Sequence, residues 1–289
     1  MPRGLFQSFW HGPELSPLEH LCIRTFLDAG HEFSLYAYEE VGNAPPGCRV
    51  EDAATIVPRD EMFVHREGIH AGSIGAFSDV FRYRLLLERG GWWADTDVIC
   101  LGLDPPEAEY VFAEQEPGVV NGAILKAPAG SRLLAEACAR ATEAGSDAAF
   151  ASVGPKLLTR IIAELGLEEH AWPSASIYPI GWDEALHILD PARRDALVEC
   201  SRESYFFHLW SEMLRLHNVL KTVRPPEGSY LAMLYDRYEI EFPIAPRYEF
   251  SQLRGQIWLH ERHRRLREEL TDLYERLELL KEEGAAERS

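Results

Sequence analysis

The stretch 77–100, FSDVFRYRLLLERGGWWADTDVIC, constrains the fold of this chain more than any other segment. Its first half carries apolar side chains at helical spacing, at Val80, Tyr83, Leu86 and Leu87. Gly90 and Gly91 follow, where a helix commonly ends on a residue that tolerates positive φ. Apolar residues then return after the glycines. We therefore predict a helix, a glycine turn and a buried strand.

An acidic triplet, Asp95-Thr96-Asp97, interrupts the apolar residues of that strand. In an extended segment alternate side chains share a face, so we expect both carboxylates to point the same way. Such a pair is unfavourable unless a cation lies between the two carboxylates. Oxygen ligands suit Mg²⁺ or Mn²⁺, which complete their shells with water and phosphate oxygens. The triplet therefore predicts metal-bridged binding of a diphosphate, although D-x-D alone is a weak signal.

The chain before this stretch favours a parallel α/β sheet. A strand at 5–10, a helix at 17–29 with Ser16 as its N-cap, and a strand at 33–38 are the opening of such a sheet. Ligands of open sheets bind beyond the carboxyl ends of the strands. The segments 41–59 and 62–73 are predicted as loops. The second loop contains three residues that we expect on the surface, His65, Arg66 and His70.

Composition excludes several classes of function. The 289 residues include 29 Lys and Arg against 47 Asp and Glu, a net charge of −18, which repels nucleic acid. The five cysteines are scattered, with no C-x-x-C pair, and are typical of reduced thiols in a cytosolic protein. No signal peptide opens the chain, and no apolar run is long enough to span a bilayer. We expect a cytoplasmic protein, or one peripheral at the inner face of the membrane.

The D-x-D triplet is accompanied by Asp79 and Arg82, which lie three residues apart and hence on one helix face. The combined pattern, S-D-x-x-R-Y followed by G-G-x-x-x-D-x-D, resembles glycosyltransferases with a DXD-containing sugar-binding region. That family includes α-1,4-galactosyl- and mannosyltransferases and capsular polysaccharide enzymes, and the spacing is similar to that of clostridial glucosylating toxins. The resemblance implies a GT-A-like α/β domain with a Rossmann-like mixed sheet at 1–245. The composition changes past Pro243 and Pro246, which predicts a C-terminal helical appendage at 246–289.

The resemblance also implies roles for single residues. Asp97 would ligate Mn²⁺ or Mg²⁺ directly, and Asp95 would bind it through water or hold the ribose. Asp79 and Arg82 would fix the ribose and the donor sugar. Asn121 interrupts an apolar strand at 119–125, and its amide either faces the cleft or caps a turn with the next residue. The catalytic set is therefore Asp79, Arg82, Asn121, Asp95 and Asp97.

Further donor contacts follow from the same resemblance. Phe9 and Trp10 end the first strand, where the base would bind; Trp10 either stacks on the base or closes the core. Gly154-Pro155 matches a helix N-terminus whose free N–H groups face the cleft. An H-x-W pattern at 208–210 resembles a loop that closes over the diphosphate and reaches the metal, but here Ser211 follows directly. The donor-binding set is Phe9, Trp10, Asp79, Arg82, Trp93, Asp95, Gly154, Pro155, His208, Trp210 and Ser211, and the metal set is Asp95, Asp97 and His208. Lys221 would help to close the site, and Trp182 and Asp183 are candidate acceptor contacts.

The residues from 251 to 283 are predicted as one amphipathic helix. Its leucines alternate three and four apart as in a heptad seam, at Leu259, Leu266, Leu270, Leu273, Leu277 and Leu280. The helix packs on the domain, pairs with a second copy, or contacts a membrane surface. The membrane alternative uses Trp258 with the basic residues Arg254, His260, Arg262, His263, Arg264, Arg265 and Arg267.

By resemblance, the chain is expected to be a metal-dependent, retaining hexosyltransferase. It would move a sugar from a nucleotide sugar, with UDP favoured, to a glycan, lipid-linked or small-molecule acceptor, as in polysaccharide biosynthesis. One alternative is a catalytically degenerate sugar-nucleotide-binding protein. Another is a metal-dependent phosphohydrolase, but such enzymes usually carry further ligands for a second metal, and none appears at recognisable spacing.

Overall fold

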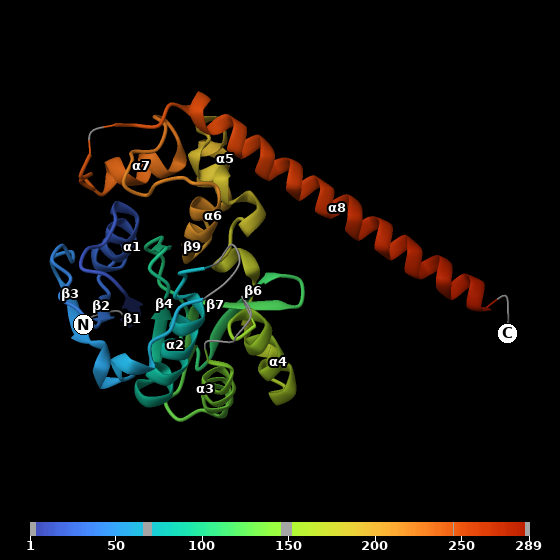
Figure 1. Ribbon diagram of the computed structural model, residues 1–289, viewed down its shortest axis with the longest axis horizontal. Coiled ribbons are helices and arrows are strands. Elements are labelled where there is room, and N and C mark those ends of the chain that lie inside the picture. The colour runs from blue at the N-terminus through green and yellow to red at the C-terminus, as the bar shows by residue number, and fades with distance from the viewer. Residues whose placement is uncertain (1–3, 66–70, 146–151, 245, 287–289) are drawn as a thin grey trace.

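The computed structural model describes residues 4–65, 71–145, 152–244 and 246–286 (Figure 1). Its main element is a mixed sheet of seven strands in the order β3-β2-β1-β4-β7-β6-β8. β1 (Leu5–Trp10), β2 (Glu32–Ala37), β3 (Cys48–Asp52) and β4 (Gly91–Ala94) are mutually parallel. β7 (Val119–Ala127) and β6 (Val111–Glu116) join antiparallel, and β8 (Ala171–Trp172) pairs parallel with β6. The predicted mixed α/β sheet is confirmed.

Helices cover both faces of this sheet, so the sheet separates two hydrophobic layers. One layer contains α2 (Gly75–Arg89), α3 (Arg132–Ala144) and α4 (Pro155–Leu165), and buries Phe9 from β1. The other contains α1 (Pro17–Asp28) and α7 (Tyr230–Arg237), and buries Phe6 from the same strand. Successive side chains of a strand point to opposite faces, so residues three apart serve different layers.

Local signals explain the ends of the two helices that frame the site. α1 begins at a capping box in which Ser16 accepts from the Leu18 N–H and Glu19 binds back to the Ser16 N–H. α2 ends at Gly90, whose φ of 64° is in the left-handed region. A side chain there would also place a Cβ 2.7 Å from the Ala129 nitrogen. The predicted glycine turn is confirmed.

A second, two-stranded sheet lies beside the first. β5 (Val98–Cys100) pairs antiparallel with β9 (Phe206–His208), so that Val98 lies opposite His208. The short helices α5 (Arg194–Cys200) and α6 (Ser211–Leu216) contact the 3-10 helix η7 (Trp182–Leu189), and α1 packs on β5. The pairing of β5 with β9 connects the middle of the chain to its C-terminal third.

Two loop predictions need correction. The segment 41–59 contains the edge strand β3 and the 3-10 helix η1 (Ala53–Thr55), and η2 (Arg59–Glu61) begins at its last residue, so it is not all loop. His65 is buried rather than on the surface. Arg66 and His70 lie outside the described residues.

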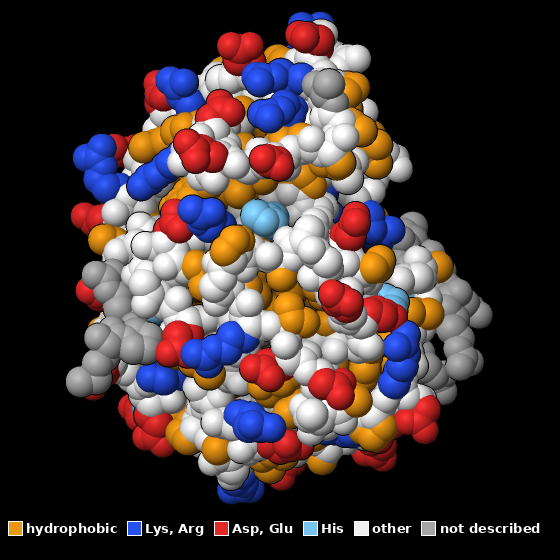
Figure 2. All heavy atoms as spheres, turned by 90° about the vertical axis from the view of Figure 1, so that its left-hand side faces the viewer, with side chains coloured by type: hydrophobic (Ala, Val, Ile, Leu, Met, Phe, Trp, Pro, Cys, Tyr) orange, Lys and Arg blue, Asp and Glu red, His pale blue; other side chains and the backbone are white. Residues whose placement is uncertain are grey.

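The C-terminal helix α8 (Phe250–Ala286) leaves the body of the molecule and projects past it (Figure 1). Its first turns pack on η7 through Leu253, Ile257 and His260, all of which are buried. The face around α1, β2 and β3 mixes acidic and basic side chains, with no broad area of either sign (Figure 2). The predicted helix is thus present, and its first half packs on the domain.

Candidate functional site

The acidic triplet lies at the joint between the two sheets. Asp95 follows β4 of the large sheet, and Asp97 precedes β5 of the small one. The Val98 N–H donates to the Asp95 carbonyl at 3.1 Å, so the triplet forms a tight turn. The expectation that an extended segment aligns the two carboxylates is therefore wrong. The turn brings them together instead.

Strand pairing places His208 against this turn. The Leu209 N–H donates to the Asp97 carbonyl at 2.8 Å, and His208 Nε2 lies 3.2 Å from Asp97 Oδ1. The Ser211 N–H donates to Asp97 Oδ2 at 2.9 Å. The Asp97 carboxylate is thus fixed by β9 and by the first residue of α6.

Asp95, Asp97 and His208 form the only three-residue group within the described ranges that could hold a metal ion, with ligand atoms within 4.8 Å of one another. Asp95 uses Oδ1 for its hydrogen bonds, while Oδ2 accepts none from the described part of the chain. His208 Nδ1 is buried without a hydrogen-bond partner among the same residues. Two carboxylates and an imidazole, with an unused oxygen on Asp95 and an unused nitrogen on His208 among the described residues, fit Mn²⁺, which accepts nitrogen more readily than Mg²⁺.

The two aspartates differ in their electrostatic environment. Burial tends to raise the pKa of Asp97, but His208 and the Ser211 N–H outweigh it and hold that pKa below its usual range. Burial raises the pKa of Asp95; Arg82 opposes this effect, and the neighbouring Asp97 adds to it. Asp97 is therefore ionised without a bound cation, whereas a nearby cation would favour the ionised form of Asp95.

Arg82 connects α2 to this cluster. Its Nη1 donates to Asp79 Oδ1 and its Nη2 to Asp95 Oδ1, both at 2.7 Å. Trp93 Nε1 donates to the same Asp95 oxygen at 2.6 Å, and its ring packs on the guanidinium at 5.0 Å. Burial raises the pKa of Asp79 to about 6 despite the opposing charge of Arg82. The predicted common helix face of Asp79 and Arg82 is confirmed.

Two glycines leave room for this network. A Cβ at Gly154 would lie 2.5 Å from Asp79 Oδ2, and one at Gly122 would lie 2.7 Å from Arg82 Nη1. Gly154 precedes Pro155, the first residue of α4. No pattern in the sequence points to Gly122, because its contact is with a residue far away in the chain.

Asn121 does not extend an unpaired amide into the site. Its Oδ1 accepts from the Ala123 N–H at 2.8 Å, and its Nδ2 donates to Gln115 Oε1 at 2.6 Å. This is the turn alternative considered above. The Asp95 N–H donates to the Ala123 carbonyl at 2.8 Å, so the segment still adjoins the cluster. A catalytic role for Asn121 stays a prediction.

Trp210 and Tyr178 enclose His208. Trp210 has a left-handed backbone with φ of 54°, and its Nε1 donates to the Ile180 carbonyl at 3.1 Å. The ring centroids of Trp210 and His208 are 4.0 Å apart. Tyr178 packs on both rings and donates to the Asn121 carbonyl at 3.1 Å. Burial raises the pKa of its hydroxyl, and the Asp95 charge adds to the effect. The sequence interpretation overlooked Tyr178 and considered its neighbours Trp182 and Asp183 instead.

The remaining predicted contacts fall in three places. Phe9 is a core residue against Phe77 and Phe81, on the α2 face of the sheet. Trp10 is partly buried at the carboxyl end of β1, with Lys221 Nζ 5.9 Å from its ring. Lys221 also forms an ion pair with the buried Glu19, a residue that sequence reasoning overlooked.

The candidate acceptor residues are covered by α8. Arg267 packs its guanidinium 4.1 Å from the Trp182 ring and donates to Asp183 Oδ2 at 2.7 Å. Asp183 is thus already paired. An acceptor that binds Asp183 has to displace Arg267.

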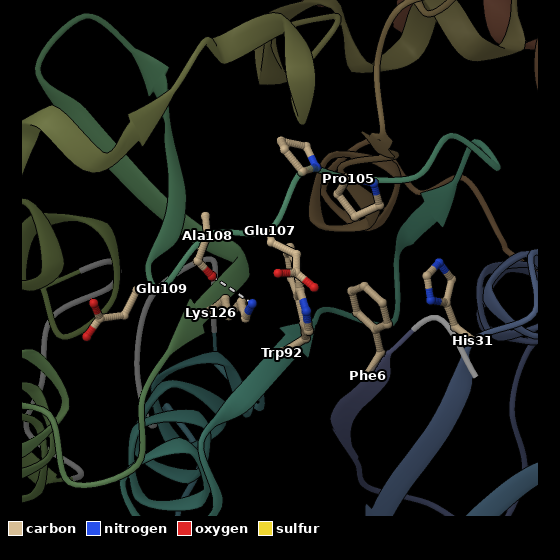
Figure 3. Close-up of a pocket in the computed structure, with 9 residues that line it drawn as sticks. Phe6, His31, Trp92, Pro105, Glu107, Ala108, Glu109 and Lys126 are labelled. Carbon is tan, nitrogen blue, oxygen red and sulfur yellow. Dashed lines mark hydrogen bonds between the residues drawn. The ribbon is translucent and has the colours of Figure 1, made fainter. Parts of the chain in front are cut away.

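A cavity of about 490 Å³ lies away from this cluster (Figure 3). Phe6, His31, Trp92, Glu107 and Lys126 are among the residues that line it. Lys126 Nζ donates to the Ala108 carbonyl at 2.7 Å, as Figure 3 shows. None of the predicted catalytic or metal residues lines it.

Comparison with known proteins gives structural likenesses at low sequence identity. No known family model matches the sequence, and no curated protein matches it. A solved structure described as "PaToxG Glycosyltransferase" has a TM-score of 0.43 and 14% sequence identity over 69% of this chain and 77% of that one. Among the helices that the structure describes, none has the length and apolar character to cross a membrane.

Proposed function

We propose that this chain is a metal-dependent glycosyltransferase that uses a nucleotide-sugar donor, with UDP favoured as the nucleotide. The observation that carries the proposal is the connection of Asp79, Arg82 and Asp95 to a group that could hold a metal ion. A charged diphosphate needs cations, and a donor sugar needs fixed polar groups at its reacting end. The cluster offers both within one set of contacts.

The residues divide the work of binding. Asp95, Asp97 and His208 would hold Mn²⁺, which when bound would offset the charge that develops on the departing diphosphate. Arg82 Nη1 holds Asp79 Oδ1, and Asp79 Oδ2, which accepts no hydrogen bond among the described residues, would bind hydroxyls of the ribose or sugar. Trp10 at the end of β1 offers an aromatic surface to the base, and Lys221 beside it adds a cation. Retention of configuration and the acceptor class remain part of this proposal.

The two rival functions fit the residues less well. A two-metal phosphohydrolase needs a second group of ligands, and within the described ranges the Asp95, Asp97 and His208 group stands alone. A degenerate binding protein does not require Arg82 to be held by two carboxylates and an indole ring. The two rivals predict different products: a phosphohydrolase releases phosphate, and a degenerate binding protein releases no product.

The test is a donor panel. Purified protein is incubated with Mn²⁺ and each of several UDP- and GDP-sugars, with and without simple glycoside acceptors, and release of nucleoside diphosphate is measured. We expect release from at least one donor, an increase on addition of acceptor, loss in EDTA and recovery with Mn²⁺. Nuclear magnetic resonance of the product then reports its anomeric configuration.

A pair of matched variants sharpens this test. Asp97→Asn removes a ligand charge and should abolish release while preserving the fold. Asp60→Asn makes the same change on an exposed residue of η2 and should leave release unchanged. Full activity in EDTA, or an active Asp97→Asn protein, would contradict the proposal. Phosphate release without sugar transfer would instead indicate the hydrolase.

A further inference from the structure

The leucine stripe of α8 lies opposite the face by which the helix packs on the body. We define this stripe by its described members Leu259, Leu266, Leu270 and Leu273, whose exposed fractions are 43%, 39%, 52% and 59%. The packing face contains Leu253, Ile257 and His260, which are buried. At 100° per residue the two sets fall on opposite sides of the helix. The body therefore leaves the stripe uncovered.

The spacing of the stripe is that of a two-helix seam. Leucine recurs every seven residues from 259 to 280, with Leu270 and Leu277 in the intervening positions. Seven-residue recurrence keeps one line of side chains facing a partner helix. A contiguous row of exposed leucines on a monomer is costly in water. The pattern therefore requires a partner that is itself a helix of matching length.

We propose that a second copy of this chain covers the leucine stripe, with the two α8 helices antiparallel. The charges beside the stripe select this orientation. Arg262, Glu269, Arg276 and Glu283 occupy one flanking position of successive heptads. In an antiparallel pair this position faces the same heptad position on the partner helix. Arg262 therefore meets Glu283 of the partner subunit, and Glu269 meets Arg276 of the partner subunit. All four contacts across the dyad are then between opposite charges.

A parallel pair would bring like charges together. In a parallel pair, the flanking position that holds Arg262 and Arg276 faces the position on the other side of the partner's stripe, in the next heptad. Arg267 and Lys281 occupy that other position. Arg262 would then meet Arg267 of the partner subunit, and Arg276 would meet Lys281 of the partner subunit. Like charges at such positions disfavour the pairing. The antiparallel arrangement avoids both repulsions.

The shape of the molecule allows this pairing. α8 extends well past the body, so two helices can overlap while the two bodies lie at opposite ends (Figure 1). A lipid surface fits the stripe less well, because exposed Glu269 borders it and exposed Trp258 points to a different side of the helix. The stripe and its charges together favour the second copy.

The first test is the mass of the full-length protein by light scattering across a concentration series. We expect a dimer that Leu266→Glu and Leu270→Glu each convert to a monomer. Trp258→Glu is the matched control, since it places the same charge on an exposed apolar residue outside the stripe, and should leave the dimer intact. A monomeric wild type, or a dimer that both leucine variants retain, overturns the proposal. Pelleting of a monomeric wild type with vesicles of anionic and neutral phospholipid, lost in Leu266→Glu and Leu270→Glu but kept in Trp258→Glu, would assign the stripe to membrane instead.

Orientation is tested by charge exchange. Arg276→Glu should weaken an antiparallel dimer, because it meets Glu269 of the partner subunit, and adding Glu269→Arg in the same chain should restore it. In a parallel dimer Arg276→Glu would instead meet Lys281 of the partner subunit and tighten association. A tighter dimer in the single variant therefore overturns the antiparallel arrangement. These measurements use mass alone, so their result is independent of whether the protein transfers sugar.

Discussion

Gly154 and Gly122 set how closely two backbone segments approach the Asp79–Arg82 pair. Gly154→Ala would place a methyl group against Asp79 Oδ2, and Gly122→Ala would place one against Arg82 Nη1. We expect each change to displace its partner and reduce nucleotide release, on the order of 10²-fold for a shift near 1 Å. Gly255→Ala has open space around it and should leave release unchanged. Wild-type rates in both site variants would show that the network tolerates this displacement.

The second prediction about a single residue concerns Trp210. Its side chain is 7% exposed and hydrogen-bonded to the Ile180 carbonyl. Trp210→Ala should lower the free energy of unfolding by roughly 3–5 kcal/mol, which corresponds to a Tm decrease on the order of 10 °C. Nucleotide release with and without acceptor should fall together.

A different outcome would give Trp210 a donor-covering role. If it closes over bound donor, its loss should change Tm little and raise hydrolysis relative to transfer, because water enters the open site. Trp210→Phe is the informative companion, since it keeps the packing against His208 and removes only the hydrogen bond. Thermal unfolding beside the two release assays distinguishes the roles.

The site could be predicted from sequence only where spacing or pattern was local. Asp79 and Arg82 were paired by helical periodicity, and a resembling pattern pointed to His208. Tyr178 and Gly122 were not predicted, because each acts through a contact with a residue distant in the chain. A local sequence pattern does not indicate contacts between residues that are distant in the chain.

Among the elements, the docking of α8 depends on paired histidines. His217 Nε2 and His260 Nδ1 are 3.0 Å apart, an arrangement in which one ring must accept. Burial lowers the pKa of both; the His263 charge lowers that of His217 further, and His217 lowers that of His260 against the opposing charge of Asp183. His187 also faces His260 and is itself bound to Glu261. Protonation of the pair therefore opposes docking.

This arrangement predicts a stability that falls on acidification. Histidine in the unfolded chain titrates near ~6.5, and the folded pKa values lie below that, so the unfolded state binds protons first. Stability is thus intact above that pH and declines as the pH falls through it. We expect His217→Gln combined with His260→Gln to reduce the Tm difference between neutral and mildly acidic buffer. His11→Gln, on an exposed histidine, should not. An unchanged pH dependence in the double variant would exclude this pair as the cause.

Elements with clear periodicity were predicted well, and those without it were not. α1, α2, β1 and β2 begin and end within about two residues of expectation, whereas the strand expected after α2 is divided into β4 and β5. β3 was predicted as loop because it is a short edge strand whose exposed residues lack an apolar alternation. The pairing of β5 with β9 depends on contacts between residues far apart, which no local pattern indicates.

At the scale of the whole molecule, the boundary between body and appendage can be measured. The sequence predicts a domain boundary after residue 245, and this boundary stays a prediction. Leu253 and Ile257 of α8, which follow it, belong to the hydrophobic core of the body. A chain ending at 249 should lose roughly 3–6 kcal/mol of unfolding free energy, at about 1.5–3 kcal/mol for each side chain. A chain ending at 268 keeps both residues and should retain the Tm of the full-length Leu270→Glu variant, which also lacks the leucine-stripe contact. Equal Tm values for the two truncated chains would place the boundary before α8.

The pairing of β5 with β9 also has a consequence for the timing of synthesis. Asp97 and His208 are separated by about 110 residues. At roughly 5–20 residues per second, the ribosome adds the second of them on the order of ten seconds after the first. During that interval β5 has no partner strand, and the aspartates lack the imidazole. A nascent chain therefore completes the group of Asp95, Asp97 and His208 only when its last third emerges.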